Sequence, residues 1–216
     1  MKSLHESILA DMESTLKQGD IDVQKQLVLE FLNENYTCKY GEYKISNKPN
    51  KQGKLVVSCD GEVVLKHGSE LKQLTNDLFV FKKVTKFSCT NASKLITLEN
   101  GPEECSSFDC SSCNKLKSLK FSPKKLMSLK CSLCYSLISL EGCSRLVRNI
   151  DCNSCISLPS LAGIPRRLNT LDISYCNALK KENLKSLPKA VGVCYCNGCS
   201  YSTDEIIKYT RVSLFN

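Results

Sequence analysis

The strongest constraint on the fold is a repeat of 21 residues that runs from residue 84 to about residue 199. When the chain is offset by 21, the first apolar position of each unit forms the column Phe87, Phe108, Leu129, Ile150 and Leu171. Further columns hold leucine in four or five successive units, and a proline recurs near the end of most units. A unit this short cannot bury its apolar edge alone, so the pattern predicts stacked coils that share one continuous core.

Cysteines fill two columns of this repeat, and the whole chain contains 15 of them. The first column is Cys89, Cys110, Cys131, Cys152 and Ile173, and the second is Ala92, Cys113, Cys134, Cys155 and Cys176. Two consecutive C-x-x-C pairs have the spacing of a zinc ribbon, but any 21-residue repeat carrying C-x-x-C produces it. Because isoleucine and alanine cannot bind zinc, we interpret both columns as small buried core residues.

We therefore predict no metal ligands and no cofactor. No C-x-x-C pair is distinguished from the others as a redox site. A metal-binding alternative stays open for the less regular cluster of Cys194, Cys196 and Cys199.

The unit L-x-x-L-x-C-x-x-C-x-x-L-x-x-L resembles the leucine-rich repeat, whose pattern is L-x-x-L-x-L-x-x-[N/C]-x-L. The segment LPSLAGIPRRLNTLDISYCNAL, residues 158–179, is similar to the short bacterial and bacteriophage type. The resemblance covers roughly half of the chain, and many columns agree at once. It implies an α/β repeat solenoid: an arc of short parallel strands with a largely nonhelical convex side and a binding face on its concave side.

Alternation along each unit predicts a strand of about 3 to 5 residues, with polar residues on the exposed face. This register assigns the following residues to the concave face: Ser107, Asp109, Ser111, Ser128, Lys130, Ser132, Asn149, Asp151, Asn153, Thr170, Asp172, Ser174 and Tyr195. The column is small, polar and mildly acidic. It is equally consistent with a binding face and with a solvated sheet face that has no ligand.

Basic residues gather where the chain descends into each strand, and they form a stripe along one edge: Lys124, Lys125, Arg145, Arg148, Arg166, Arg167 and Lys189. Such a stripe can meet nucleic acid or an acidic protein, but aromatic residues are not interleaved with it. We therefore favour a solvated edge and do not expect a nucleic-acid partner.

The two ends of the chain differ from the repeat. Residues 1–83 are predicted to form a cap of two helices, residues 3–17 and 20–36, followed by a hairpin at residues 54–66 that turns at Asp60 and Gly61. Residues 84–200 form a solenoid of five to six coils. Residues 201–216 form a C-terminal cap with a short helix that starts at Ser202 or Thr203.

The net charge is +8, and no apolar run approaches the length of a membrane span. The opening MKSLHESILADMES does not build a signal peptide, so we expect a cytoplasmic protein with reduced thiols and no membrane partner. MKSLHESIL also resembles the openings of proteins encoded by tailed bacteriophages. That resemblance implies the host cytoplasm or, if the segment directs the chain into the head, the virion.

No catalytic set emerges, since His5 and His67 lie far from any nucleophile or carboxylate motif with catalytic spacing. The first functional hypothesis is a non-enzymatic interaction module that binds a protein partner. A virion or head-associated structural protein anchored by its N-terminal helix is the second hypothesis, and a cysteine-rich zinc-binding protein is the third.

Overall fold

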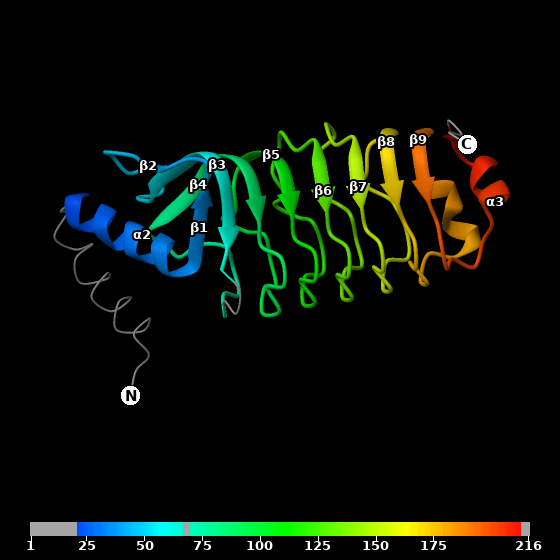
Figure 1. Ribbon diagram of the computed structural model, residues 1–216, viewed down its shortest axis with the longest axis horizontal. Helices are drawn as coiled ribbons and strands as arrows, with labels where there is room; N and C mark the ends of the chain where they lie inside the picture. Colours follow the sequence, from blue (N-terminus) through cyan, green and yellow to red (C-terminus); the bar gives the residue numbers. More distant parts are fainter. Residues whose placement is uncertain (1–20, 67–69, 213–216) are drawn as a thin grey trace.

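The computed structural model describes residues 21–66 and 70–212, and these form a parallel-strand β-solenoid of about seven turns (Figure 1). One sheet runs the length of the molecule in the order β1-β3-β4-β5-β6-β7-β8-β9-β10, with β2 paired to β3. The strands are β1 Tyr36–Lys39, β2 Tyr43–Ile45, β3 Leu55–Leu65, β4 Phe79–Ser88, β5 Glu104–Asp109, β6 Ser128–Lys130, β7 Asn149–Asp151, β8 Arg167–Asp172, β9 Ala190–Tyr195 and β10 Arg211–Val212. The helices are α2 Ile21–Asn35, α3 Thr203–Ile207 and the 3-10 helix η1 Lys181–Ser186.

The repeat columns become the core of the solenoid. Phe108, Leu129, Ile150 and Leu171 are direct partners in successive parallel strands, and all are buried. At one end of this column the rings of Phe87 and Phe108 stack with their centroids 5.5 Å apart. Strands β6 and β7 have the predicted length, whereas β5, β8 and β9 extend to six residues.

Each coil leaves its strand through a residue in the left-handed backbone region. This position is occupied by Asn91, Ser112, Leu133, Ser154, Tyr175 and Gly198, whose φ angles lie between 58° and 65°. The amide of each non-glycine member donates to the carbonyl of a residue in the next coil, as Leu133 does to Asn153 at 2.8 Å. The turn is therefore held by hydrogen bonds between coils, which lets residues other than glycine occupy it.

The predicted hairpin at residues 54–66 is wrong. Residues 55–65 form one uninterrupted strand, β3, whose side chains alternate between buried and less buried along all eleven residues. The strands antiparallel to β3 are β1 and β2, which precede it, so the hairpin turns at the loop of residues 46–54 instead. Asp60 and Gly61 resemble a tight turn in sequence, but Gly61 does not adopt a positive φ, and the pair forms an irregularity in the ladder with β4.

Helix α2 lies at the N-terminal end of the sheet and packs its buried side chains Val28, Phe31 and Leu32 toward the core (Figure 1). The ring of Phe31 meets that of Phe79 edge-on at 5.7 Å. This helix matches the second of the two that the sequence predicts. The first, residues 3–17, lies outside the described residues, so the helical cap as a unit stays a prediction.

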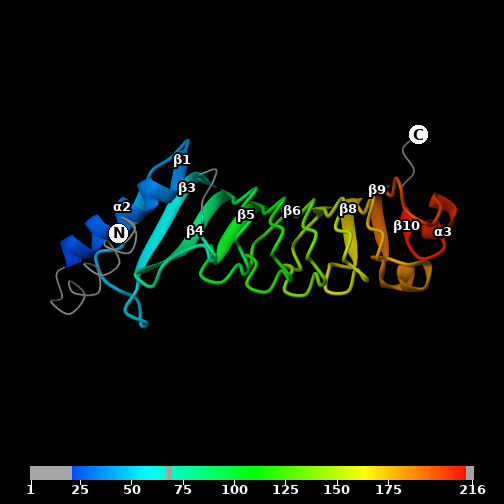
Figure 2. The ribbon, with the colours of Figure 1, turned by 90° about the horizontal axis from the view of Figure 1, so that it is seen from below.

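At the other end α3 begins with a capping box, in which Ser202 and Glu205 each accept a hydrogen bond from the other's backbone amide. Ile206 and Tyr201 bury their side chains there, and β10 continues the parallel ladder beside β9. The ladder also extends backward through β4 to β3, so parallel pairing reaches beyond residues 84–200 at both ends (Figure 2). Over the described part of the chain, no helix is long and apolar enough to cross a membrane.

Candidate binding face of the sheet

The exposed side of strands β5 to β9, with the residues that directly follow them, forms one continuous polar surface, which we call the sheet face. Strand register places Asp109, Lys130, Asp151, Asp172 and Tyr195 side by side in one row across it. The two neighbouring rows carry serine, asparagine and threonine, apart from Val193 in β9, and hydroxyl contacts join some of the adjacent coils. The order of the acidic residues, interrupted at Lys130, is as the sequence predicts.

The three aspartates are oriented by the same local contact. One carboxylate oxygen of each accepts the backbone amide two residues later, from Ser111, Asn153 and Ser174, at 3.0, 3.1 and 2.9 Å. This contact follows from an aspartate at the end of a strand, where the chain turns and its amides would otherwise lack a partner. The second carboxylate oxygen of each aspartate is left for contacts at the sheet face.

A hollow of about 250 Å³ lies in the C-terminal half of the sheet face. The row of charges contributes Lys130, Asp151, Asp172 and Tyr195, and half of the tyrosine side chain is exposed. The remaining lining residues are Ser128, Leu129, Asn149, Ile150 and Thr170. Seven of the predicted concave-face residues therefore meet at one place that combines a phenol ring with two carboxylates.

Charge is not balanced within this hollow. The pKa of the Asp151 carboxyl is raised, mainly by burial and also by the neighbouring Asp172. The hydrogen bond from the amide of Asn153 and the charge of Lys130 lower this pKa, but not enough to cancel the increase. Two carboxylates on adjacent strands repel each other and lose part of their hydration. A cationic group in the hollow reduces both costs.

Ser174 was predicted to lie on the exposed face, and this prediction is wrong. Its side chain is buried, and its hydroxyl accepts the amide of Asn197 in the next coil at 3.1 Å. The residue therefore stabilises the turn and is not available to a ligand. The row that contains it includes Ser111 and Ser132, whose hydroxyls are 3.0 Å apart and remain half-buried.

The predicted basic edge lies where the coils enter the strands. Arg167 pairs with Ala190, which follows Lys189, and the amide of Ala190 donates to the carbonyl of Arg166. All members but Arg148 are exposed. Two members already have protein partners: Lys125 pairs with Glu104 at 2.9 Å, and Arg148 donates to the carbonyls of Leu146 and Val147. Contacts of this kind are typical of a solvated edge.

The structure has a third surface that is not among those predicted from the sequence. Exposed apolar side chains gather at the turns that leave the strands, and each is 39 to 56% exposed: Leu133, Tyr135, Ile138, Ile156 and Tyr175. The signal was present in the columns, since Tyr135 and Ile156 occupy one position of successive units and Leu133 and Tyr175 share another. We call this set the apolar edge.

The repeat cysteines lie in the core, as predicted, and the second cysteine of each unit donates to a main-chain carbonyl of the preceding coil. Burial raises the pKa of the Cys143 and Cys194 thiols to about 12. Cys194, Cys196 and Cys199 are half-buried. Within residues 21–66 and 70–212, no three cysteine, histidine or acidic side chains are grouped so that they could hold a metal ion.

Fold and surface together define a β-solenoid whose sheet face is open, polar and hollowed at one end. Comparison of the chain with protein-family models, with curated proteins and with solved structures found no match.

Proposed function

We propose that the protein is a leucine-rich-repeat interaction module that binds a protein partner through the sheet face, without a catalytic step. The observation that carries this proposal is the hollow between Asp151, Asp172 and Tyr195. A solenoid presents an extended sheet surface to its partner, and a hollow on that surface gives the partner an anchoring point. The repeating thiol-to-carbonyl bonds support the leucine-rich-repeat assignment, because the same slot of that repeat takes asparagine or cysteine.

The chemistry of the hollow favours a partner that presents a lysine or arginine side chain from an extended segment. The positive charge of that side chain is attracted by the carboxylates of Asp151 and Asp172, and its cationic group can lie over the ring of Tyr195. The basic edge does not compete for this ligand because it carries the same sign of charge.

Selection from a displayed library of random peptides tests this proposal with purified protein. We expect wild-type protein to enrich peptides with lysine or arginine at a fixed position, and the double variant Asp151→Asn/Asp172→Asn to lose that enrichment. Lys124→Ala, on the basic edge, is the matched control and should select the same peptides as wild type. If the double variant enriches the same lysine- or arginine-containing peptides as wild type, the hollow does not bind those peptides.

A further inference from the structure

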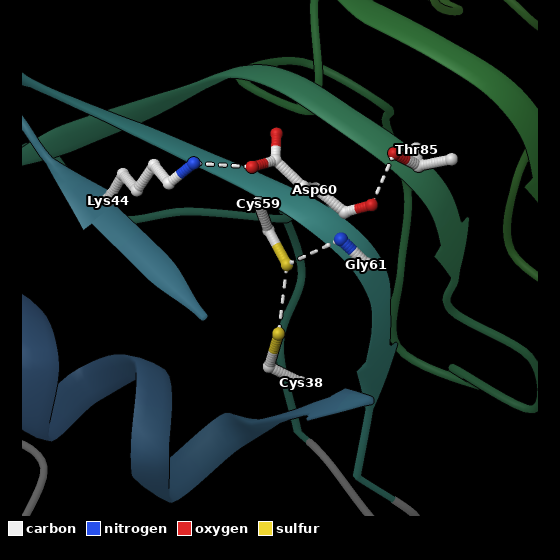
Figure 3. A network of polar contacts seen from close by, with 6 residues as sticks. All are labelled: Cys38, Lys44, Cys59, Asp60, Gly61 and Thr85. Carbon is white, nitrogen blue, oxygen red and sulfur yellow. Dashed lines mark hydrogen bonds and ion pairs between the residues drawn. The ribbon is translucent and has the colours of Figure 1, made fainter. Parts of the chain in front are cut away.

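Cys38 of β1 and Cys59 of β3 differ from the cysteine pairs of the repeat in exposure, because Cys38 is half-buried whereas the cysteines of the two repeat columns are buried. Their sulfur atoms are 2.8 Å apart and point toward each other (Figure 3). Thiols of the repeat also lie close to one another, as those of Cys113 and Cys89 do, but both members of each such pair are buried, and Cys113 also donates to the main-chain carbonyl of Cys89 at 3.1 Å. Cys38 and Cys59 therefore form a pair of thiols in direct contact.

Two glycines bring these strands together. A Cβ on Gly61 would lie 2.2 Å from the carbonyl oxygen of Lys39, and one on Gly41 would lie 2.7 Å from the amide nitrogen of Gly61. The link between β1 and β2 therefore touches the backbone of β3 beside Cys59, at the point where the ladder with β4 shifts register. Only residues without a side chain allow this approach.

Polar contacts hold the irregular part of β3 in place (Figure 3). The amide of Gly61 donates to the sulfur of Cys59 at 3.3 Å, which fixes the direction of that side chain. Next to it, Lys44 pairs with the carboxylate of Asp60, and the hydroxyl of Thr85 donates to the Asp60 carbonyl at 2.6 Å. The contact between the two sulfur atoms is thus set by the surrounding backbone.

The two thiols differ in access. Cys59 is fully buried, whereas Cys38 is half-buried and lines a hollow of about 470 Å³ with Thr37, Glu42 and Lys66. A small molecule that enters the hollow meets Cys38 first. This combination of an accessible thiol and a buried second thiol is what an exchange reaction with a resolving cysteine requires.

We propose that Cys38 and Cys59 are a dithiol site that a small disulfide of the glutathione type oxidises to an intramolecular disulfide. In the first step the Cys38 thiolate attacks one sulfur of the small disulfide, forms a mixed disulfide and releases one small thiol. In the second step the Cys59 thiolate attacks the Cys38 sulfur, forms the Cys38–Cys59 bond and releases the second small thiol. The protein loses two electrons and two protons, and the small disulfide gains them.

The cross-link joins the edge strand β1 to β3 and closes the loop that contains β2. Closing a loop of this size restricts the unfolded chain, so the oxidised protein should unfold at a temperature roughly 5 to 10 °C higher than the reduced protein. The site works independently of any partner at the sheet face.

The test uses the reduced wild-type chain under native conditions, in buffers of increasing ratio of oxidised to reduced glutathione. Free thiols are blocked with N-ethylmaleimide, and the protein is digested without reductant for mass spectrometry. We expect the Cys38–Cys59 peptide pair, lighter by two hydrogen atoms than the free peptides, to accumulate before any other disulfide. Recovery of both cysteines as free thiols or as separate glutathione adducts, while other disulfides accumulate, would overturn the proposal.

A pair of variants separates the two steps. Cys59→Ser should stop at the mixed disulfide, which adds the mass of one glutathionyl group at Cys38. Cys105→Ser, which removes a buried cysteine of strand β5 outside the two repeat columns, should still form the Cys38–Cys59 bond. Circular dichroism checks that both variants fold, and the wild-type experiment decides the question if either does not. Absence of any adduct at Cys38 in folded Cys59→Ser would also contradict the mechanism.

Discussion

The thiol of Cys134 donates a hydrogen bond to the main-chain carbonyl of Cys110, one coil earlier, at a sulfur–oxygen distance of 3.1 Å. The same bond joins Cys155 to Cys131 at 3.0 Å and Cys176 to Cys152 at 3.1 Å. Each bond satisfies a carbonyl that faces the core, where water does not reach. The second cysteine column therefore connects neighbouring coils as well as filling space.

Replacing Cys134 by alanine should lower the free energy of unfolding by about 1 to 3 kcal/mol, because it removes the donor and leaves a small cavity. Cys134→Ser should cost less than the alanine variant, since its hydroxyl still donates to the carbonyl of Cys110. Urea unfolding monitored by circular dichroism compares the two variants. Equal stability of Cys134→Ala and wild type would mean that the bond contributes nothing.

Leu133 should be replaceable with a gain in stability. It has a φ of 59° in a position where the other coils use asparagine, serine, glycine and, once, tyrosine. Asparagine tolerates this region better than leucine, so Leu133→Asn should raise the free energy of unfolding by about 0.5 to 1 kcal/mol. Ser132→Asn, one residue earlier and outside the left-handed region, is the control and should bring no such gain in thermal denaturation.

Asp151 should destabilise the fold at neutral pH. Burial and the neighbouring Asp172 raise the pKa of its carboxyl, so the folded state holds the proton more tightly than the unfolded state does. Its contribution to stability is therefore greatest at low pH and is lost as the pH rises through the carboxyl range. Asp151→Asn should be more stable than wild type at pH 7, by less than about 1 kcal/mol because the group is half-exposed.

Melting curves of Asp151→Asn and wild type at several pH values check this prediction. The difference should shrink to zero near pH ~3, where the wild-type carboxyl is protonated as well. A variant that is less stable than wild type at pH 7 would show that the carboxylate is favourable in the folded protein. The predicted gain in stability, together with loss of peptide binding, is the behaviour expected of a residue kept for binding.

The rate of oxidation at Cys38 should depend steeply on pH. Burial and the contact with Cys59 raise the pKa of the Cys38 thiol to about 12. Only the thiolate attacks a disulfide, so the initial rate at which oxidised glutathione consumes the Cys38 thiol of the wild-type protein should increase about tenfold per pH unit between pH 7 and 9. A rate that levels off below pH 8 would indicate a thiol with a much lower pKa.

Gly61→Ala should disturb both the fold and the thiol pair. Its Cβ would meet the main-chain atoms of Lys39 and Tyr40, which cannot move without separating β1 from β3. We expect a loss of more than about 2 kcal/mol in the free energy of unfolding and a lower yield of the Cys38–Cys59 disulfide. Gly53→Ala is the matched control: a Cβ there has no neighbour within 4 Å, and only its φ of 77° opposes the change, at about 1 kcal/mol.

Periodicity made the repeat predictable. Columns that contain only apolar residues and cysteine must face a shared core, so Leu129 and Cys131 could be placed without a structure. The row of Asp109, Lys130, Asp151 and Asp172 followed from the same register. These predictions required only the spacing of the units and the alternation along a strand.

What the period does not describe was harder to predict. Asp60 and Gly61 have the composition of a hairpin turn, yet the alternation of buried residues continues across them, and the pairing partners of β3 precede it in the chain. The burial of Ser174 depends on an amide in the next coil. Cys38 and Cys59 meet where Gly41 and Gly61, twenty residues apart in the sequence, let two backbone segments approach closely, which no local pattern reveals.

The central claim is that the hollow on the sheet face binds a cationic segment. Amide hydrogen exchange, measured with and without a peptide selected by the wild-type protein, locates the bound ligand most directly. We predict protection concentrated in β7, β8 and the end of β9, with little change along the basic edge or the apolar edge. Protection confined to either edge, with the amides of these strands unaffected, would contradict the account.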